Sequence, residues 1–531
     1  MSVRLVFAVA CALAAGAAAA QVRLPRHFGN DMVLQQGRAV AVRGWACPGA
    51  DVDVAFAGQS VRTRAAADGA WSVSLAPLAA SDVGRDLSVR ESGAASSALV
   101  LTNVVVGEVW ILAGQSNMQW PLVRTDDGKE AQARARYPSL RYMFNDGGAM
   151  SAGPCSDDPP GAHWEVCTPS NAGRMSGVGF YFGERLMLDR RTPVGLVMTA
   201  CGGTAMESWV TRPWLEKCPP FAKLLQRFDR ENAAWVATNG FASAVADFWS
   251  RADLYYRQLD EAKAGKGKAP GWRPFLPFCT TSWPFNRIPT VHYDAKIAPL
   301  AGFPVAGVLW YQGETECWAG GRGEGPACTF GERLSSVIGC WREAWGESLW
   351  FVVSGLASKD GRKDDGHAII RKEQLSVAER LPNVAVASIL DTGEKDEVHA
   401  RDKTLVGERL AHAARRAVYG ETSLARTPYA RRATFADDGA RVDVRTDAGL
   451  VARGELRGFE LRVGGRWVPA TAEIRGTSVF VRTPGGRPDG VRYLWTGWAK
   501  PLCSLYDGQG QPVTTFSFEA QLHETVLTDC P

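Results

Sequence analysis

The sequence predicts an α/β protein whose central part is a parallel β-sheet with helices on both faces. Three observations indicate this class. Residues 101–420 alternate apolar, β-branched runs with amphipathic segments, which is typical of strands and helices in turn. Residues 21–100 and residues 421–531 instead show short alternating strands and glycine-rich turns. We therefore expect an α/β domain at 101–420 between an N-terminal β domain at 21–100 and a C-terminal β domain at 421–531.

The first twenty residues have the features of a cleaved signal peptide. Arg4 precedes an apolar core at Leu5–Leu13, and an alanine-rich stretch ends before Gln21. No later apolar run is long and clean enough to predict a transmembrane helix. The sequence therefore predicts export, either as a secreted or as a periplasmic protein, without a membrane anchor.

Composition argues against two kinds of partner. The net charge of +4 is small for 531 residues, and the basic residues do not gather into a stripe, so nucleic-acid binding is not expected. Of twelve cysteines, Cys11 lies in the signal peptide, which leaves eleven. In an oxidising compartment we expect some of them to pair, with Cys317/Cys328 and Cys503/Cys530 as candidates by proximity, and at least one to be left over. No CxxC or Cys/His cluster is present, and we expect neither a metal nor another cofactor.

The short strands of the flanking regions follow from period-two alternation. In the N-terminal region the alternating residues are Val40/Val42, Val52/Val54/Phe56, Val61/Thr63 and Trp71/Val73/Leu75, with a turn at Asp68-Gly69. In the C-terminal region the expected strands are Arg441–Arg445, Phe459–Val463, Val479–Arg482 and Val491–Trp495. Whether these two regions pack on each other or on the central domain stays open.

The most informative segment is Gly114–Met118, with the sequence GQSNM. It follows Asn103–Ala113, an apolar run that predicts a buried strand. Ser116 is thus expected where a strand turns into a helix, with its hydroxyl exposed and backbone N–H groups beside it. A serine in this place is a candidate nucleophile if a base and oxyanion donors lie near. An N-capping role is the alternative.

The candidate base is His399. It follows another expected strand, Asn383–Leu390, and precedes an amphipathic segment, Asp402–Arg416, that predicts a helix. Loops at the carboxyl ends of parallel strands are where open α/β sheets build their sites. Asp396 stands three residues before the histidine, so one loop offers an imidazole and a carboxylate to orient it.

Two further strand ends carry candidate oxyanion donors. The expected strand Pro193–Thr199 leads into a glycine turn that contains Gly203, whose backbone N–H can approach a ligand closely. The expected strand Phe303–Leu309 leads into a segment that contains Gln312. Together with Ser116 and His399, these pieces predict a serine esterase site at one edge of the sheet.

The order GQSNM, GGTAMESW, WYQGETE and DEVH resembles the SGNH hydrolase superfamily, specifically its sialate O-acetylesterase-like branch of carbohydrate acetylesterases. The resemblance begins at Leu24–Gln36, ends near Val491–Phe516 and covers nearly the whole mature chain. It implies an SGNH-type, flavodoxin-like sheet. It also implies deacetylation of a carbohydrate, with sialic acid and plant polysaccharides such as xylan or xyloglucan as open alternatives.

The resemblance also assigns roles to residues. It implies Ser116 as nucleophile and His399 as base. Its oxyanion hole would consist of the Ser116 N–H, Gly203, and Gln312 where other SGNH enzymes have asparagine. We predict Asp396 as the orienting acid, although many relatives have a carboxylate two residues before the histidine, which is Glu397 here, and a Ser-His dyad is the third alternative. The chain departs from the family pattern at two positions, Ala400 and Cys201, where a proline and an aromatic residue are usual.

Three residues near these motifs are candidates for substrate binding: Gln115, Trp120 and Glu314. Glu314 is alternatively expected to order its loop or to polarise His399. A segment rich in aromatic residues, about 215–290, predicts a helical insertion over Pro219–Ala262. We expect it mainly to bury its own aromatic side chains, with Trp272, Trp283 or Phe285 as an alternative platform for a sugar ring.

The predicted reaction is transfer of an acetyl group from a carbohydrate ester to Ser116, followed by hydrolysis. Two functions of other classes stay open. A hydrolase of lipid or thioester substrates would use the same scaffold, and a non-catalytic carbohydrate-binding protein would use the flanking β domains. The oligomeric state is not predicted.

Overall fold

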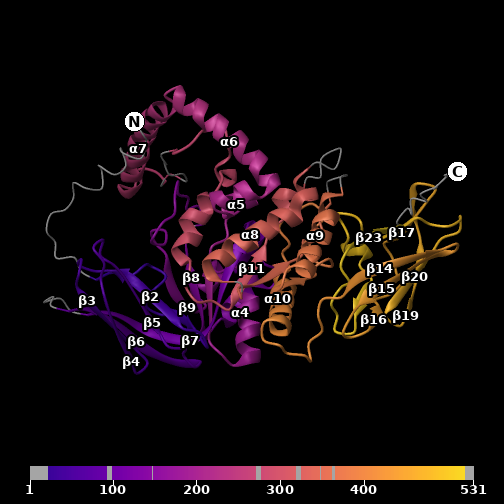
Figure 1. Cartoon of the computed structure of the whole chain (residues 1–531), viewed down its shortest axis with the longest axis horizontal. Helices are drawn as coiled ribbons and strands as arrows, with labels where there is room; N and C mark the ends of the chain where they lie inside the picture. The colour runs from indigo at the N-terminus through magenta and orange to yellow at the C-terminus, as the bar shows by residue number, and fades with distance from the viewer. Residues whose placement is uncertain are drawn as a thin grey trace, which may run out of the picture.

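The computed structural model describes residues 22–92, 98–145, 147–268, 270, 277–317, 325–346, 348–360 and 365–520. The N-terminal strands and the C-terminal strands lie at opposite ends of the molecule, with the α/β part between them (Figure 1). The two β regions therefore do not pack on each other. The expected signal peptide lies outside the described residues.

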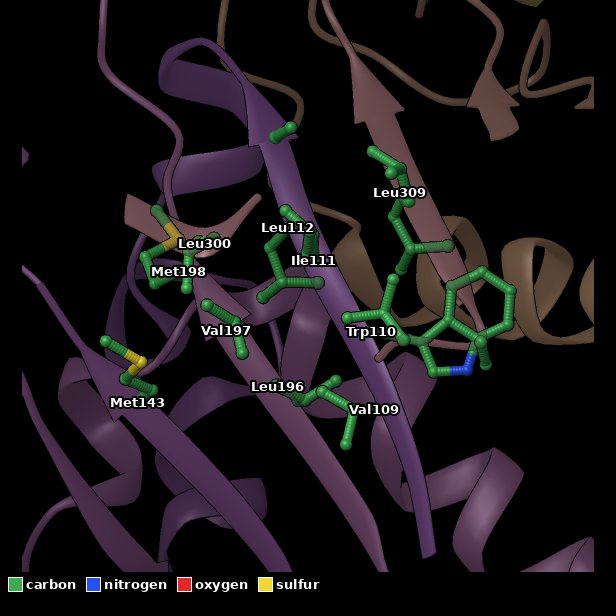
Figure 2. Close-up of a cluster of buried hydrophobic side chains, with 14 of the residues drawn as sticks. Val109, Trp110, Ile111, Leu112, Met143, Leu196, Val197, Met198, Leu300 and Leu309 are labelled. Atoms are coloured by element: carbon green, nitrogen blue, oxygen red, sulfur yellow. The ribbon is translucent and has the colours of Figure 1, made fainter. Parts of the chain in front are cut away.

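The central sheet has the strand order β13-β12-β11-β7-β10-β8-β9. All neighbours pair in parallel except β9, which is antiparallel to β8. Its strands are β7 (Leu99–Gly114), β8 (Tyr137–Phe144), β9 (His163–Cys167), β10 (Val194–Met198), β11 (Gly307–Tyr311), β12 (Trp350–Ser354) and β13 (Val384–Ala387). The sequence predicted that this strand begins at Phe303, whereas β11 begins four residues later, at Gly307, because residues 303–306 have no regular secondary structure. Apolar side chains of β7, β8, β10 and β11 form the core of this sheet (Figure 2).

The helices of the described chain are α2 (Ser116–Gln119), α3 (Gly128–Arg134), α4 (Gly177–Arg190), α5 (Arg212–Lys217), α6 (Pro219–Ala237), α7 (Gly240–Lys263), α8 (Phe330–Trp345), α9 (Gly366–Arg380) and α10 (Lys403–Ala417). Side-chain caps begin two of them. Ser176 accepts a hydrogen bond from Gly179 N at the start of α4, and Asp402 accepts one from Leu405 N at the start of α10.

Helices cover both faces of the central sheet. Trp110 of β7 contacts Phe182 of α4 on one face, with ring centroids 5.1 Å apart. Trp310 of β11 pairs in register with Ala113 and so points to the opposite face, because successive side chains of a strand alternate. There it contacts Trp341 of α8. The prediction of helices on both faces is confirmed.

The N-terminal strands are β1 (Val33–Gln35), β2 (Val40–Trp45), β3 (Asp51–Phe56), β4 (Gln59–Arg64), β5 (Ala70–Leu75) and β6 (Ser81–Glu91). Four of them, β1, β3, β4 and β6, are continuous with the central sheet, whereas β2 and β5 form a separate two-stranded sheet. Strands β1 and β6 both pair with the first half of β7, whose second half belongs to the parallel sheet. The expected domain boundary near residue 100 therefore falls inside one long strand.

The C-terminal region contains three small sheets, of which two have four strands and one has two. Its strands are β14 (Tyr429–Ala436), β15 (Gly439–Arg445), β16 (Leu450–Ala452), β17 (Phe459–Val463), β18 (Arg466–Pro469), β19 (Thr471–Arg475), β20 (Ser478–Arg482), β21 (Gly490–Tyr493), β22 (Leu505–Asp507) and β23 (Phe516–Glu519). The region packs against the central part through α9. There the buried side chain of Arg371 donates to the carbonyls of Thr496 and Gly497 at 2.8 and 3.0 Å.

The insertion is helical, as predicted, and consists largely of α6 and α7, which project away from the sheet (Figure 1). Its aromatic side chains are not all buried. Phe221 of α6 is fully buried, but Trp249 and Tyr256 of α7 are 62% and 61% exposed. The expectation that the insertion buries its own aromatic residues is therefore wrong for α7.

Candidate active site

Four loops meet at the carboxyl edge of the central sheet. Ser116 follows β7, Gly203 follows β10 and Gln312 follows β11, and these three strands are neighbours in the sheet. The loop that contains His399 leaves β13 at the same edge and leads into α10. The sequence prediction that these segments converge is in agreement with this arrangement.

The glycine before the nucleophile is required by its backbone. Gly114 has φ +118°, and a Cβ atom there would lie 2.2 Å from the carbonyl oxygen of Tyr311. This close approach brings β7 and β11 together, so that Gln115 N donates to the same oxygen at 3.1 Å. Ser116 is the first residue of α2 and is half-buried. The turn from strand to helix is therefore as predicted.

The imidazole of His399 is held on two sides. Its Nδ1 lies 2.9 Å from a carboxylate oxygen of Glu397, which also accepts a hydrogen bond from His399 N at 3.1 Å. Because a carboxylate only accepts, Nδ1 carries the proton and the lone pair of the neutral ring lies on Nε2. The indole of Trp120 stacks on the ring, with centroids 4.2 Å apart and planes inclined by 18°.

The acid predicted from the sequence, Asp396, is not the one in contact with the imidazole. The side chain of Asp396 is exposed and does not contact the ring, whereas that of Glu397 reaches back across the one residue that separates it from His399. The longer glutamate arm makes this local contact possible. The Asp396 assignment is therefore corrected to Glu397, which was the stated alternative.

Asn117 connects the nucleophile segment to the histidine loop. Its buried carboxamide nitrogen donates to the carbonyl of Val398 at 3.0 Å and to a carboxylate oxygen of Glu314. Its oxygen accepts a hydrogen bond of 2.5 Å from the ammonium of Lys403, at the start of α10. The residue after Ser116 is thus bonded to the residue before His399. The Ser116 hydroxyl and the His399 imidazole, both among the described residues, do not hydrogen-bond directly, and such bonds often tighten only with substrate.

Both charged partners of Asn117 are withdrawn from water. Burial lowers the pKa of Lys403 to about 7, although the carboxylate of Glu314 opposes this shift. Burial also raises the pKa of Glu314, with the hydrogen bond from Asn117 opposing. Burial lowers the pKa of His399 as well, while Glu397 raises it and Lys403 lowers it further. The site therefore favours a neutral imidazole, which is the form that acts as a base.

The glycine turn after β10 lies against the nucleophile. A Cβ atom on Gly202 would be 3.4 Å from Cβ of Ser116. The N–H of Gly202 donates to the side-chain oxygen of Gln119 at 3.0 Å, whereas the N–H of Gly203 has no acceptor within the part of the chain that the structure describes. Gly203 has φ +71°, and Asn286 donates to its carbonyl at 2.6 Å. The turn therefore offers the Gly203 N–H to a ligand, in line with the predicted role.

Gln312 does not have the role predicted from the sequence. Its side chain is fully buried, and its amide nitrogen donates to the carbonyl of Thr204 and to a carboxylate oxygen of Glu316, each at 3.0 Å. Because this nitrogen carries two hydrogens, neither is left for an oxyanion. Burial and the nearby Glu207 raise the pKa of Glu316 to about 7. Gln312 thus supports the turn that contains Gly203, because it donates to the carbonyl of the next residue, Thr204.

Comparison with known proteins agrees with this site. The family described as "Carbohydrate esterase, sialic acid-specific acetylesterase" matches residues 106–240 and 291–416. The sialate O-acetylesterases of Rattus norvegicus and Homo sapiens are 26% and 25% identical, over 91% of this chain and 92% and 90% of theirs. A solved carbohydrate acetylesterase from Xanthomonas citri is 29% identical and superposes with a TM-score of 0.75, covering 94% of this chain and all of the other. The chain belongs to this family of carbohydrate esterases.

The three candidates for substrate binding have other contacts in this esterase. Gln115 is buried, so its side chain is withdrawn from the surface. Trp120 stacks on His399, and its indole N–H donates to the Arg124 carbonyl at 3.2 Å. Glu314 accepts from Asn117, which agrees with the alternative that it orders its loop. The structure therefore places these side chains around Ser116 and His399 without exposing them as clear substrate contacts.

The aromatic platform is also placed differently from the prediction. Trp272 lies outside the described residues. Trp283 packs on Phe228 of α6, with its N–H donated to Glu231 at 2.5 Å. Phe285 is 49% exposed and directly precedes Asn286, which contacts the oxyanion turn. Of the two described candidates, Phe285 is the one beside the site.

Sequence reasoning did not identify Asn117, Lys403 or Asn286 as parts of the site. Asn117 and Lys403 lie one and four residues from the catalytic pair, so their position in the chain was the available signal. Asn286 lies in the insertion and carried no such signal. Among the described residues, no helix is long and apolar enough to cross a membrane, and no three His, Cys, Asp or Glu side chains are grouped to hold a metal ion.

Proposed function

We propose that the protein is an exported serine esterase that removes O-acetyl groups from carbohydrates through an acetyl-serine intermediate. The observation that carries the proposal is the bond from Asn117 to Val398, which joins the nucleophile segment to a histidine whose Nδ1 is occupied by Glu397. With the additional parallel strand β8 at the edge of β10 left out, the order β10-β7-β11-β12-β13 equals the 2-1-3-4-5 order of flavodoxin-like sheets and supports the SGNH type. Export rests on the sequence of residues 1–20.

In the first half-reaction, Nε2 of His399 takes the proton of the Ser116 hydroxyl as its oxygen attacks the acetyl carbonyl. The oxyanion accepts hydrogen bonds from the N–H groups of Ser116 and Gly203. The bond between the acetyl carbon and the sugar oxygen then breaks. The protonated Nε2 returns its proton to that oxygen, and the deacetylated sugar leaves.

In the second half-reaction, water attacks the acetyl-serine ester while Nε2 accepts one of its protons. The second tetrahedral intermediate is held by the same two N–H groups. Its collapse returns the proton to the Ser116 oxygen and releases acetate. Glu397 keeps the proton on Nδ1 throughout, so that Nε2 is the nitrogen that takes up and returns the reacting proton.

The test is acetate release from a panel of acetylated glycans, which includes O-acetylated sialic acid, xylan and xyloglucan. We expect Ser116→Ala and His399→Ala to remove nearly all activity at unchanged thermal stability. Mass spectrometry of a rapidly quenched reaction should locate an acetyl group on Ser116. Full activity of either variant would overturn the assignment.

A chain-length series of nitrophenyl esters tests the substrate class. An acetylesterase should prefer the acetate, with kcat/KM falling as the acyl chain lengthens. A preference for long chains would favour a lipid or thioester hydrolase on the same scaffold.

A further inference from the structure

A large cleft lies away from the catalytic edge, between the central part and the C-terminal region. It has a volume of about 1350 Å³. One wall consists of the edge strand β13 and the last turns of α9 and α10, and the other consists of the β14–β15 pair. Figure 1 shows these C-terminal strands beside α9 and α10. The catalytic loop leaves the other end of β13, so the cleft is a separate feature.

Six arginines line this cleft: Arg380, Arg416, Arg426, Arg431, Arg432 and Arg445. The lining contains two carboxylates, Glu379 and Asp443, so positive charge is in excess. Arg432 pairs with Asp443 at 2.9 Å, and Arg426 pairs with Asp447 at 3.0 Å. Within the described chain, Arg380, Arg431 and Arg445 form no ion pair. Three guanidinium groups thus remain for an external anion.

A β-bulge directs two consecutive arginines into the cleft. The register between β14 and β15 shifts between Ala430 and Arg432, which makes Arg431 the extra residue. In a regular strand, neighbouring side chains point to opposite faces, and a bulge changes that direction. Arg431 and Arg432 both line the cleft for this reason. Arg445, directly opposite Tyr429 across the ladder, donates to its hydroxyl at 3.2 Å.

The lining of the cleft also contains a hydrogen-bond donor that has no acceptor. The buried Nε of Arg416 has no hydrogen-bond acceptor among the described residues. A buried donor without a partner costs free energy, and an entering anion would satisfy it. Trp350 and Tyr429 add flat aromatic faces to the lining. Guanidinium groups next to aromatic rings suit a ligand that has both carboxylates and apolar C–H faces.

We propose that this cleft is an accessory binding site for a carboxylate-bearing glycan, such as a segment of uronic acid residues. Its volume exceeds the 300–1,000 Å³ that is typical of sites for single small ligands, so an oligomer is the better fit. Each sugar carboxylate accepts a bidentate pair of hydrogen bonds from one guanidinium. The evidence for an anion-binding cleft is its geometry and charge, whereas the choice of a glycan as the ligand rests on the proposed function.

The test measures binding of an oligogalacturonate to the full-length protein by isothermal titration calorimetry. We expect binding that weakens with added salt, and little binding of a neutral xylo-oligosaccharide of the same length. Arg431→Gln/Arg445→Gln should weaken binding at least about tenfold, because it removes two charged donors. Arg380→Gln, on the opposite wall, should weaken it in the same direction.

The control is Arg466→Gln/Arg487→Gln, which makes the same change of charge at exposed residues outside the cleft. It should leave oligogalacturonate binding unchanged. Equal losses in the two double variants, no oligogalacturonate binding, or tighter binding of polyphosphate or a DNA oligonucleotide would overturn the proposal. Hydrolysis of nitrophenyl acetate should be unchanged in all these variants, so a failure of the proposed esterase function is seen separately.

Discussion

At the scale of single residues, the geometry of His399 depends on its two immediate neighbours. Glu397 determines which ring nitrogen carries the proton, and Trp120 determines the plane of the ring. Glu397 is itself more than half exposed, so water screens its charge. Its main contribution is therefore to the tautomer and orientation of the imidazole.

The first prediction compares Glu397→Gln with Asp396→Asn. Glu397→Gln should lower kcat/KM by about one to two orders of magnitude, less than the ~10⁴-fold loss in a buried triad, because the carboxylate is exposed. Asp396→Asn makes the same chemical change one residue away and should have little effect. Steady-state kinetics on nitrophenyl acetate give both values, and the reverse ordering would return the role to Asp396.

The pH profile provides an independent readout of the same variant. A general base works when neutral, so kcat/KM should fall as the pH drops through the pKa of His399, which burial lowers below its usual value of about 6.5. Glu397 raises this pKa, and its loss should move the acidic limb to still lower pH. If the acidic limb of the pH profile moved to higher pH or stayed in place, the contact between Glu397 and His399 would be contradicted.

The second prediction concerns Gln312. Gln312→Ala should lower the free energy of unfolding by about 1–3 kcal/mol, because it leaves the Thr204 carbonyl without a donor and removes one of the two donors to the buried Glu316 carboxylate. It should also lower kcat, since the glycine turn loses its support. Ser116→Ala is the control, with activity lost and thermal stability kept. A large loss of kcat at unchanged stability would restore Gln312 as a direct oxyanion donor.

At the scale of elements, the site depends on loops that are bonded to one another. The Asn117 carboxamide joins three of them: the loop after β7, the loop after β11 through Glu314, and the start of α10 through Lys403. Small displacements between such elements have large catalytic effects, because the reacting groups must be aligned. The central β-sheet alone does not align the reacting side chains.

The third prediction is that Asn117→Ala lowers kcat about a hundredfold with little change in KM, since the catalytic groups are misaligned while the substrate contacts remain. It should also lower stability, because Lys403 loses a buried acceptor. Glu314→Gln is the control, as its amide oxygen can still accept from Asn117, and it should have a mild effect. If Asn117→Ala raised KM alone, the residue would be a substrate contact.

At the scale of the whole molecule, the C-terminal region stabilises the catalytic part. The guanidinium of Arg371 donates to the Thr496 and Gly497 carbonyls and, within the central part, to those of Leu356 and Ala357. Burial lowers its pKa to about 10, so it is charged at neutral pH. Lys500 and Tyr506 contact the start of the histidine loop, at Gly393 and Asp391.

The fourth prediction is that Arg371→Ala markedly lowers the melting temperature and makes the junction near residues 418–428 sensitive to protease. The buried carbonyls of Leu356 and Ala357 and the half-buried carbonyl of Thr496 lose this donor, at a cost of about 1–3 kcal/mol for each group left unpaired. The Gly497 carbonyl keeps the N–H of Lys359. Lys372→Ala, at the next and exposed position of α9, should change neither property. Unaltered thermal unfolding of Arg371→Ala would show that the two parts are held together by other contacts.

The sequence by itself determined where the reactive residues lie. Short apolar runs in the sequence predict the buried strands. Because parallel strands end at one edge of a sheet, the residues that follow them could be assigned to that edge: Ser116, Gly203, Gln312 and His399. The helical nature of the insertion and of α10 followed from the same kind of pattern.

The tertiary structure alone decided how these side chains are used. The choice between Asp396 and Glu397 depends on how a loop folds back, and the direction of the Gln312 amide depends on Thr204, more than a hundred residues away. The bonds of Asn117 and Arg371 likewise span long stretches of chain. A periodic pattern records which side of an element is buried, whereas a hydrogen bond between distant segments depends on the packing that brings them together.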